Sequence, residues 1–488
     1  MKDKTLILKH LLIAVLIFPL MTNCSDEDEI TDPTTSDTES DTETQELDAQ
    51  TLMINNFIDE NMSIYYFWNE EMPDLDPKKE EDSEEYFYKL LKEPDDKWSF
   101  ITDDYEGLMN YFSGIQKSTG YSLMPMYLEQ GSNQVIAFIE YVHRNSPASE
   151  AGLERGDMIY RIDGQIMTDQ NYSDLLSRDI FDITLAEIQT NEDGDIEIIE
   201  LPDEIPMVAE EINLHPVIES TIIDTLDHKI GYLAYSSFVS NYDTALVNTF
   251  SHFKSAGITD LVVDLRYNGG GSVSTAALIG DILVPPGNVG ETFIEEVYND
   301  LLTVAFKREP DYEPDDFLIK FEQNSNNLNI DKFYVLTTPS TASASEMVIY
   351  GLEPYMDVIQ IGETTHGKYY ASATFWDREE KKHNWAIQPI ILRSINATNS
   401  IDYSKGLPPD HILDDLFYLM PNKYQLGDPD ELFMAKAISL ITGEPFIYED
   451  FVNGLKSASP KPVESYRLRN NLYPGRSRMW IDKPGWMK

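Results

Sequence analysis

Three short motifs carry residue types that can perform acyl transfer, and the first contains Ser343. It lies in the run STASASE (340–346), directly before a segment, 344–352, that we expect to be a helix. Ser-x-x-Glu is a common helix start, so Ser343 and Glu346 also fit a purely structural capping box. A nucleophile at this position would gain from the helix N-terminus, which favours negative charge, and the N–H of Ala344 could meet an oxyanion.

The second motif, GETTHGK (362–368), predicts a strand followed by a turn that presents Lys368. A lysine in a turn is usually a solvated surface residue. As a general base it must lose its proton near neutral pH, which requires burial or cationic neighbours that lower its pKa by about 3.

The third motif is DLRYNGGG (264–271), which follows a run, 260–265, typical of a buried strand. Its glycines leave backbone N–H groups free to point at a developing anion. Taken alone, this loop could equally hold a phosphate or form a tight turn.

These motifs lie in residues 206–450, where strand and helix patterns alternate. We expect strands at 230–235, 260–265 and 333–337 and helices at 242–256, 270–283 and 344–352. This alternation predicts an α/β core whose helices cover a sheet.

Residues 111–205 contain short strand patterns separated by turn signals. The run SPASEAGLERGDMIYRIDGQ (146–165), with a hairpin turn at Asp163-Gly164, resembles a PDZ domain. The resemblance implies a loop whose N–H groups receive a peptide C-terminus while the peptide adds as a strand, and a groove helix at 171–178. The loop is assigned to Gly120, Tyr121, Ser122 and Leu123.

The remaining folded segments flank these two units. Residues 51–110 predict a small helical domain with an aromatic cluster at 65–68 and a second helix at 86–91. Residues 451–488 form a basic extension, which we expect to be irregular and docked on the acidic body of the protein.

The N-terminus predicts export and anchoring. Basic residues precede a short apolar run that ends at Cys24, the only cysteine of the chain, and residues 1–24 resemble a bacterial lipoprotein signal peptide. Residues 25–50, with eleven Asp or Glu and no Lys or Arg, predict a disordered tether. The acidic run after Cys24 resembles the surface-export signal of lipoproteins in Bacteroides-like bacteria. We therefore expect an outer-membrane lipoprotein of the cell envelope that faces the surface; a linker facing the periplasm remains the alternative.

Composition excludes several function classes. The chain has 36 basic and 86 acidic side chains and a net charge of −50, which opposes binding to nucleic acid. A single cysteine excludes disulfide scaffolds and Cys-based zinc or iron–sulfur sites, and the eight histidines show no metal-binding spacing. We expect no metal and no cofactor.

The order and spacing of the three motifs resemble the carboxyl-terminal processing, or tail-specific, serine peptidases. The resemblance implies that Ser343 is the nucleophile, that Lys368, 25 residues later, is the base, and that the oxyanion donors are Gly270 or Gly271 and Ala344. The run GLPPD (406–410) resembles a further family element.

The chain departs from the family pattern at three positions. Ser372 stands where many members have a glutamine that orients the lysine, so Ser372 is the candidate for that role. Gly269 replaces the usual proline of the glycine loop. His366 has no assigned role and could perturb Lys368 electrostatically.

The resemblance implies a fold of three parts: a small helical N-terminal domain, a PDZ domain and an α/β tail-specific-protease (ClpP/crotonase-like) core. It implies a serine endopeptidase with a Ser-Lys dyad, polypeptide substrates captured by the PDZ domain, and a lipid anchor at Cys24. The alternative is a catalytically silent lipoprotein that binds a ligand or peptide on the same scaffold. The oligomeric state cannot be inferred from the sequence.

Overall fold

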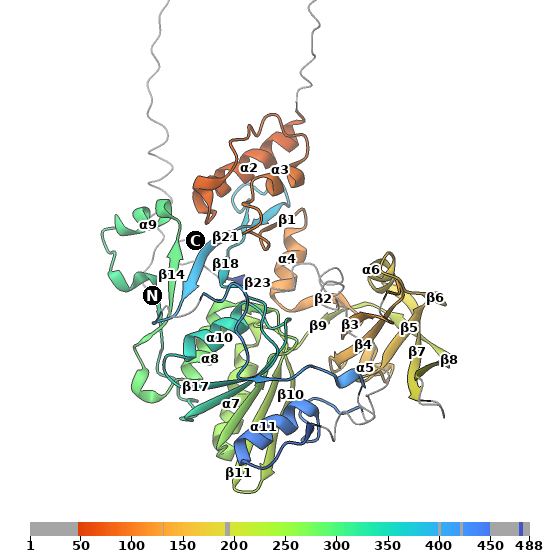
Figure 1. Ribbon diagram of the computed structural model, residues 1–488. Helices are drawn as coiled ribbons and strands as arrows, with labels where there is room; N and C mark the ends of the chain where they lie inside the picture. The colour runs from red at the N-terminus through yellow and green to blue at the C-terminus, as the bar shows by residue number, and fades with distance from the viewer. Residues whose placement is uncertain are drawn as a thin grey trace, which may run out of the picture.

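Figure 1 shows the computed structural model as a core with a helical domain at the top and a small sheet domain at the right. The structure describes residues 47–129, 131–190, 196–398, 402–419, 423–448 and 478–481. The signal peptide, Cys24 and nearly all of the tether lie outside these residues. Within these ranges, no helix is both long and apolar enough to cross a membrane.

The N-terminal domain consists of α2 (Ala49–Tyr65), η1 (Asn69–Glu71), α3 (Ser83–Lys89), β1 (Phe100–Thr102) and α4 (Tyr105–Phe112). The expected second helix begins earlier than predicted because Asp82 caps it, accepting the N–H of Glu85 at 2.8 Å. The domain also contributes the strand β1, which pairs with β20 (Ala386–Gln388) of the core. Tyr66 from this domain and Met347 from the core belong to the same buried apolar cluster, so the two parts share one hydrophobic core.

The PDZ-like domain is a sheet in the order β3-β4-β5-β7-β8. Its elements are β3 (Tyr121–Tyr127), β4 (Val135–Val142), α5 (Pro147–Glu150), β5 (Met158–Ile162), β6 (Gln165–Ile166), α6 (Tyr172–Leu176), β7 (Ile180–Thr190) and β8 (Ile196–Val208). The turn predicted at Asp163-Gly164 is present, with positive φ at both residues, as a type I′ hairpin requires. β3 forms one edge of this sheet. A strand, β2 (Ile115–Ser118), enters the domain and pairs with β9 (Glu210–Asn213), which leaves it.

The core sheet has the order β10-β11-β12-β16-β17-β22, and all pairs except β10 with β11 are parallel. Its strands are β10 (Val217–Thr225), β11 (His228–Tyr235), β12 (Asp260–Asp264), β16 (Lys332–Thr337), β17 (Asp357–Gly362) and β22 (His411–Ile412). Helices α7 (Asp243–Ala256), α8 (Val273–Leu283) and α10 (Ala344–Leu352) pack on one face and α11 (Leu432–Thr442) packs on the other. The predicted α/β core with helices covering a sheet is therefore confirmed.

A second sheet stands beside the N-terminal ends of α8 and α10 and has the order β13-β23-β18-β21-β14-β15. Its strands are β13 (Gly270–Ser272), β23 (Arg478–Trp480), β18 (Tyr370–Ser372), β21 (Ile390–Ile395), β14 (Thr292–Tyr298) and β15 (Leu318–Lys320); α9 (Asp300–Lys307) and β19 (Phe375–Trp376) lie nearby. Gly270 and Gly271, predicted as the entry to a helix, form a strand because β23 pairs with them. The prediction that the basic extension is irregular is therefore wrong at residues 478–480, which form β23.

Candidate active site

Ser343 occupies a strained position between β16 and α10. Its φ of 67° and ψ of −116° place a non-glycine residue in a region that L residues rarely adopt. The side chain is fully buried, and Oγ makes no hydrogen bond with any described residue. Backbone strain of this kind persists only where the surroundings enforce it and is concentrated at functional sites. The conformation therefore supports more than a capping role.

The buried carboxylate of Glu346 connects the two candidate catalytic residues. Oε2 accepts the backbone N–H of Ser343 at 2.7 Å and the backbone N–H of Lys368 at 2.9 Å. Oε1 accepts the N–H of Gly367 at 2.6 Å and the hydroxyl of Thr365 at 2.5 Å. Burial raises the pKa of Glu346 to about 7, although these four donors act to lower it.

Sequence reasoning assigned Glu346 only a capping role. The capping contact exists, because the carboxylate binds the N–H of Ser343. The same carboxylate also fixes the turn that presents Lys368. The backbone N–H groups of Ser343 and Lys368 therefore both donate to one oxygen atom of Glu346. No local sequence pattern signals this second role, because the partner turn lies about twenty residues further along the chain.

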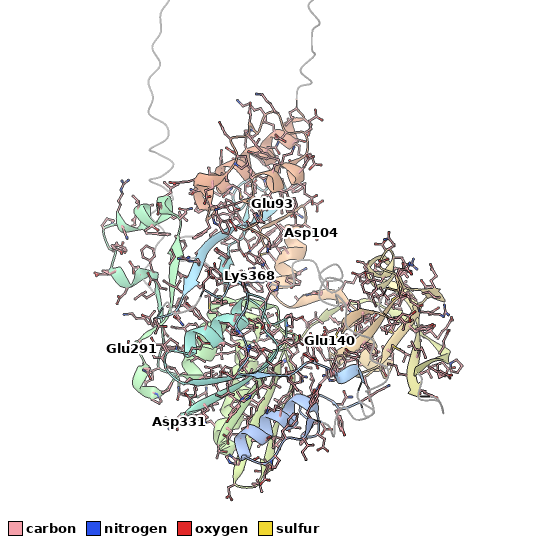
Figure 2. The ribbon with its side chains drawn as sticks, viewed as in Figure 1. Glu93, Asp104, Glu140, Glu291, Asp331 and Lys368 are labelled. Carbon is pink, nitrogen blue, oxygen red and sulfur yellow. The ribbon has the colours of Figure 1, made fainter. Side chains whose placement is uncertain are left out.

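Lys368 lies in the turn between β17 and β18, near the centre of the molecule in Figure 2. Its side chain is 1% exposed, and Nζ lies 5.8 Å from the centroid of the Trp98 ring, which the N-terminal domain supplies. Burial disfavours the charged form of an amine, which is the condition that a lysine base requires. The interpretation suggested by the turn alone, that Lys368 is a solvated surface residue, is therefore wrong.

His366 lies beside Lys368, and its charge state decides whether it can perturb the lysine electrostatically. Burial lowers the pKa of His366 to about 4, and the amines of Lys368 and Lys97 act in the same direction when they are protonated. The ring accepts a long hydrogen bond, 3.5 Å, from Nε1 of Trp98. At neutral pH His366 is uncharged, so it adds no positive charge beside the lysine.

The glycine loop is tied to the serine loop by the buried side chain and backbone of Asn268. The carbonyl of Asn268 accepts the N–H of Ala342 at 3.0 Å, and its Oδ1 accepts the N–H of Gly270 at 2.8 Å. Because Gly270 already donates to Asn268, Gly271 is the glycine whose N–H suits an oxyanion. Gly271 has a φ of 142°, and a Cβ there would lie 2.1 Å from the carbonyl oxygen of Phe238, so only glycine fits.

The other candidate donor, the N–H of Ala344, belongs to the first turn of α10. The first N–H groups of a helix have no acceptor within the helix and point out of its N-terminus. Ala344 is fully buried next to Ser343, so an anion that formed there would be shielded from water.

A network of buried charges supports the glycine loop from behind. Arg266, in the loop, is fully buried and pairs with Asp264 at 2.7 Å and with Glu431, the N-cap residue of α11, at 2.8 Å. Arg155 of the PDZ-like domain joins the network: it donates to the hydroxyl of Tyr267 at 2.7 Å and approaches Glu431 at 3.5 Å. The PDZ-like domain is thereby connected to the loop that carries Gly271.

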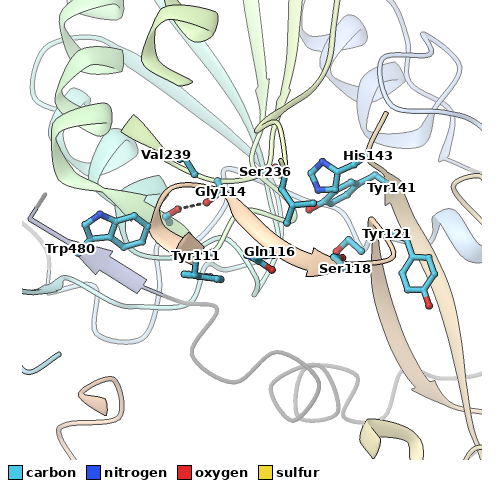
Figure 3. Close-up of a pocket in the computed structure, with 15 residues that line it drawn as sticks. Tyr111, Gly114, Gln116, Ser118, Tyr121, Tyr141, His143, Ser236, Val239 and Trp480 are labelled. Atoms are coloured by element: carbon cyan, nitrogen blue, oxygen red, sulfur yellow. Dashed lines mark hydrogen bonds between the residues drawn. The ribbon is translucent and has the colours of Figure 1, made fainter. Parts of the chain in front are cut away.

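A cavity of about 330 Å³ lies between the PDZ-like domain and the core (Figure 3). Tyr121 and Ser122 line it on one side and Gly269 and Gly270 on the other. The remaining residues of the predicted loop do not line it: Leu123 is buried in the core of the PDZ-like domain. Gly120 lies at the start of β3 with a φ of 87°, and a Cβ there would lie 2.2 Å from that of Ser146.

Ser372, the predicted orienting residue, lies at the end of β18 and is buried. Its hydroxyl donates to the carbonyl of Met479 at 2.8 Å and accepts from Nε2 of Gln388 at 3.0 Å. The proton of this hydroxyl and one of its two acceptor sites are therefore already engaged by Met479 and Gln388. No local sequence pattern pointed to Gln388, which contacts Ser372 from β20.

The described residues contain no group of three or more His, Cys, Asp and Glu side chains arranged to hold a metal ion. The groups that the candidate site presents are a buried serine hydroxyl, a buried amine and backbone N–H groups.

Three segments of the chain match models of known protein families. Residues 229–410 match the model of peptidase family S41, residues 53–100 match the peptidase S41 N-terminal domain, and residues 138–186 match a PDZ domain. Ser343, Lys368 and the glycine loop fall within the first match, whereas the loop at 120–123 lies outside the third.

Characterised relatives are distant. A carboxyl-terminal-processing protease of Synechocystis is 22% identical over 61% of this chain and 63% of its own length. The carboxy-terminal processing protease CtpA of Bacillus subtilis is 22% identical over 54% of this chain and 51% of its own length. This chain thus spans about half to three fifths of the length of these relatives.

A solved structure of a putative S41 protease from Bacteroides fragilis is 26% identical, with a TM-score of 0.65, and the match covers 80% of this chain and 98% of that one. Together with the three family matches, this likeness confirms the predicted combination of N-terminal domain, PDZ domain and α/β protease core. The chain belongs to peptidase family S41, the family of the carboxyl-terminal processing serine peptidases.

Proposed function

We propose that this protein is a serine endopeptidase of the cell envelope in which Ser343 is the nucleophile and Lys368 the general base. The observation that carries the proposal is the strained, buried Ser343, whose backbone N–H shares one carboxylate oxygen of Glu346 with the backbone N–H of the buried Lys368. Structural capping requires neither the strain nor the buried amine.

In the acylation step, Oγ of Ser343 bonds to the carbonyl carbon of the scissile peptide while its proton passes to the neutral amine of Lys368. The N–H groups of Gly271 and Ala344 stabilise the oxyanion. The ammonium of Lys368 then protonates the leaving nitrogen, the C–N bond breaks, and an ester to Ser343 remains. Water, deprotonated by the same amine, hydrolyses that ester and restores the serine.

We further propose that the PDZ-like domain captures an unstructured polypeptide end. β3 is an edge strand, so a peptide can add to it through backbone hydrogen bonds. Tyr121 and Ser122, at the start of β3, line the cavity that reaches Gly270 of the catalytic loop. A peptide bound at this edge would therefore lead into a cavity that the glycine loop lines.

The cellular setting is proposed from the sequence alone. Cys24 would carry the lipid, and residues 25–50 would hold the catalytic domains away from an outer membrane, facing the surface. The lipid is the means by which the protein would remain bound to the membrane.

A serine-reactive fluorescent phosphonate tests the reaction mechanism. Wild-type protein and Ser340→Ala, which removes a nearby serine from the same loop, should be labelled and should cleave an unstructured polypeptide. Ser343→Ala should do neither while keeping its circular dichroism spectrum. Cleavage by the Ser343→Ala variant would refute the mechanism, and a correctly folded wild-type protein that neither reacts nor cleaves would favour a silent binding protein.

A further inference from the structure

The short strand β23 lies between the two elements that carry the candidate catalytic groups. On one side it pairs in parallel with β13, placing Met479 opposite Gly271. On the other side it pairs with β18, placing Trp480 opposite Ser372, four residues after Lys368. This part of the basic extension therefore occupies a slot between the oxyanion loop and the strand that follows the lysine, near the centre of Figure 1.

The slot binds the backbone of its occupant. The N–H of Ile481 donates to the carbonyl of Ser372 at 3.1 Å, and the hydroxyl of Ser372 donates to the carbonyl of Met479 at 2.8 Å. Ser372 thus binds one N–H and one C=O of the strand. Such contacts are available to any extended peptide, whatever its side chains.

The occupied edge of β13 is the one that presents Gly271. The carbonyl of Gly270 accepts the N–H of Phe238 at 2.9 Å, and the N–H of Ser272 donates to the carbonyl of Phe238 at 2.8 Å. Backbone groups of successive residues in a strand point to opposite edges. The N–H and C=O of Gly271 therefore face β23, and the extension covers the backbone group that best suits the oxyanion.

The side chains of the occupant are also bound. Met479 is fully buried, and Trp480 is 5% exposed. The indole stacks on Phe112 of α4, with ring centroids 4.2 Å apart and an angle of 23° between the rings, and it packs with Leu108 and Ala386. Figure 3 shows Trp480 at the end of the cavity opposite Tyr121 of the PDZ-like domain.

Charge also favours docking of this segment. Residues 456–488 contain eight Lys or Arg and two acidic residues, whereas the whole chain has a net charge of −50. Opposite net charges draw the extension toward the body of the protein and weaken with added salt.

We propose that the slot between β13 and β18 is a substrate-binding subsite and that residues 478–481 occupy it as an internal competitor. This inference rests on the proposed peptidase function. The preferred occupant is an extended peptide with a large aromatic residue at the position of Trp480, where Phe112 supports the ring. Substrate must displace the extension before the N–H of Gly271 can meet an oxyanion.

Binding of a peptide added in trans tests the subsite without catalysis. The probe is a fluorescein-labelled peptide of residues 477–483, measured by anisotropy with full-length Ser343→Ala protein. Two double variants carry a second substitution in addition to Ser343→Ala. Ile481→Pro removes the N–H that donates to the carbonyl of Ser372, and Trp480→Ala removes the ring that stacks on Phe112. If the extension fills the slot in nine of ten molecules, either change should raise the apparent affinity about tenfold. Trp480→Phe, which keeps an aromatic ring on Phe112, is the matched control and should raise it much less.

Measurements of KM and kcat with Ser343 intact show whether residues 478–481 act as a competitor or as a structural strand. Ile481→Pro should lower KM for an unstructured polypeptide about tenfold and leave kcat unchanged, because a competitor affects only access. Unchanged peptide affinity and KM in both Ile481→Pro and Trp480→Ala would overturn the inference. A fall in kcat without tighter peptide binding would also overturn it and would make β23 a structural part of the sheet.

The two proposals fail in different ways. If no variant cleaves polypeptide or reacts with a phosphonate, but the released slot binds the peptide tightly, the peptidase function is refuted and the slot remains a peptide-binding site. If the wild-type protein cleaves and the extension variants behave like it, the subsite is refuted and the peptidase function stands.

Discussion

The carboxylate of Glu346 offers a prediction whose size can be worked from the structure. Its pKa is raised from the ordinary value of 4.5 to about 7 because burial outweighs four hydrogen-bond donors. For an acid whose pKa is raised by folding, the associated stability is fully present below the unfolded pKa and is lost as pH rises through the folded pKa. At about 1.4 kcal/mol per pKa unit, the loss between those two values is about 3 kcal/mol.

Glu346→Gln removes this titration. The free energy of unfolding of the wild type relative to Glu346→Gln should therefore fall by about 3 kcal/mol from about pH 4 to about pH 8. Urea unfolding at a series of pH values measures this difference, and infrared difference spectroscopy should show a carboxyl band that titrates near neutral pH only in the wild type. Glu291→Gln, which removes an exposed carboxylate, is the matched control.

The same variant tests Glu346 as a positioning residue. An amide nitrogen cannot accept a hydrogen bond, so at least one buried N–H of the site loses its acceptor, at a cost of about 1–3 kcal/mol. The backbone of Ser343 or Lys368 then shifts, and kcat should fall by on the order of 100-fold with little change in KM. A stability difference that does not change with pH would show that the four donors balance burial, so that the pKa is not raised, and would refute the reasoning.

Three further predictions concern the base, the domain connection and the anchor. Lys368→Arg should be as inactive in peptide cleavage as Lys368→Ala, because a guanidinium stays protonated; an active Lys368→Arg enzyme would place the base elsewhere. Arg155→Met should lower the free energy of unfolding in urea by about 3–5 kcal/mol because it breaks a buried ion network, whereas Arg144→Met, which loses an exposed pair, should cost less than about 1 kcal/mol. Cys24→Ser should move the protein from the detergent to the aqueous phase on Triton X-114 partitioning; retention in the detergent phase would contradict lipidation at this residue.

The sequence identified those parts of the site that local patterns encode. The helix expected at 344–352 is α10 with the same bounds, and the Gly-rich loop follows β12 as predicted. These features depend on short-range signals: a serine before an apolar helical segment, and glycines after a buried strand. The roles of Ser343, Lys368 and the oxyanion donors remain predictions, which the structure makes geometrically consistent.

The features that the sequence did not reveal depend on contacts between distant residues. Glu346 looked like a capping residue because its bond to Ser343 is local, whereas its bonds to Gly367 and Lys368 form only when β17 packs beside β16. The strand β23 has three residues and no alternating pattern, and it is a strand only because β13 and β18 bind it. Hydrophobic periodicity cannot detect an element whose conformation its partners impose.

Ser372 shows how one departure from a family pattern can be understood through such a contact. A glutamine at this position would be long enough to orient the lysine, but the short side chain of Ser372 instead binds the carbonyl of Met479. With the extension in place, the hydroxyl of Ser372 is held in one orientation by its bonds to Met479 and Gln388. Once the extension leaves, the hydroxyl can bind the carbonyl of an incoming peptide in the same way, or turn so that its oxygen accepts an N–H of Lys368 and leaves the lone pair of the amine for the proton of Ser343. The exchange of glutamine for serine therefore links the orientation of the base to the occupancy of the slot, a link that the pattern of the family alone does not contain.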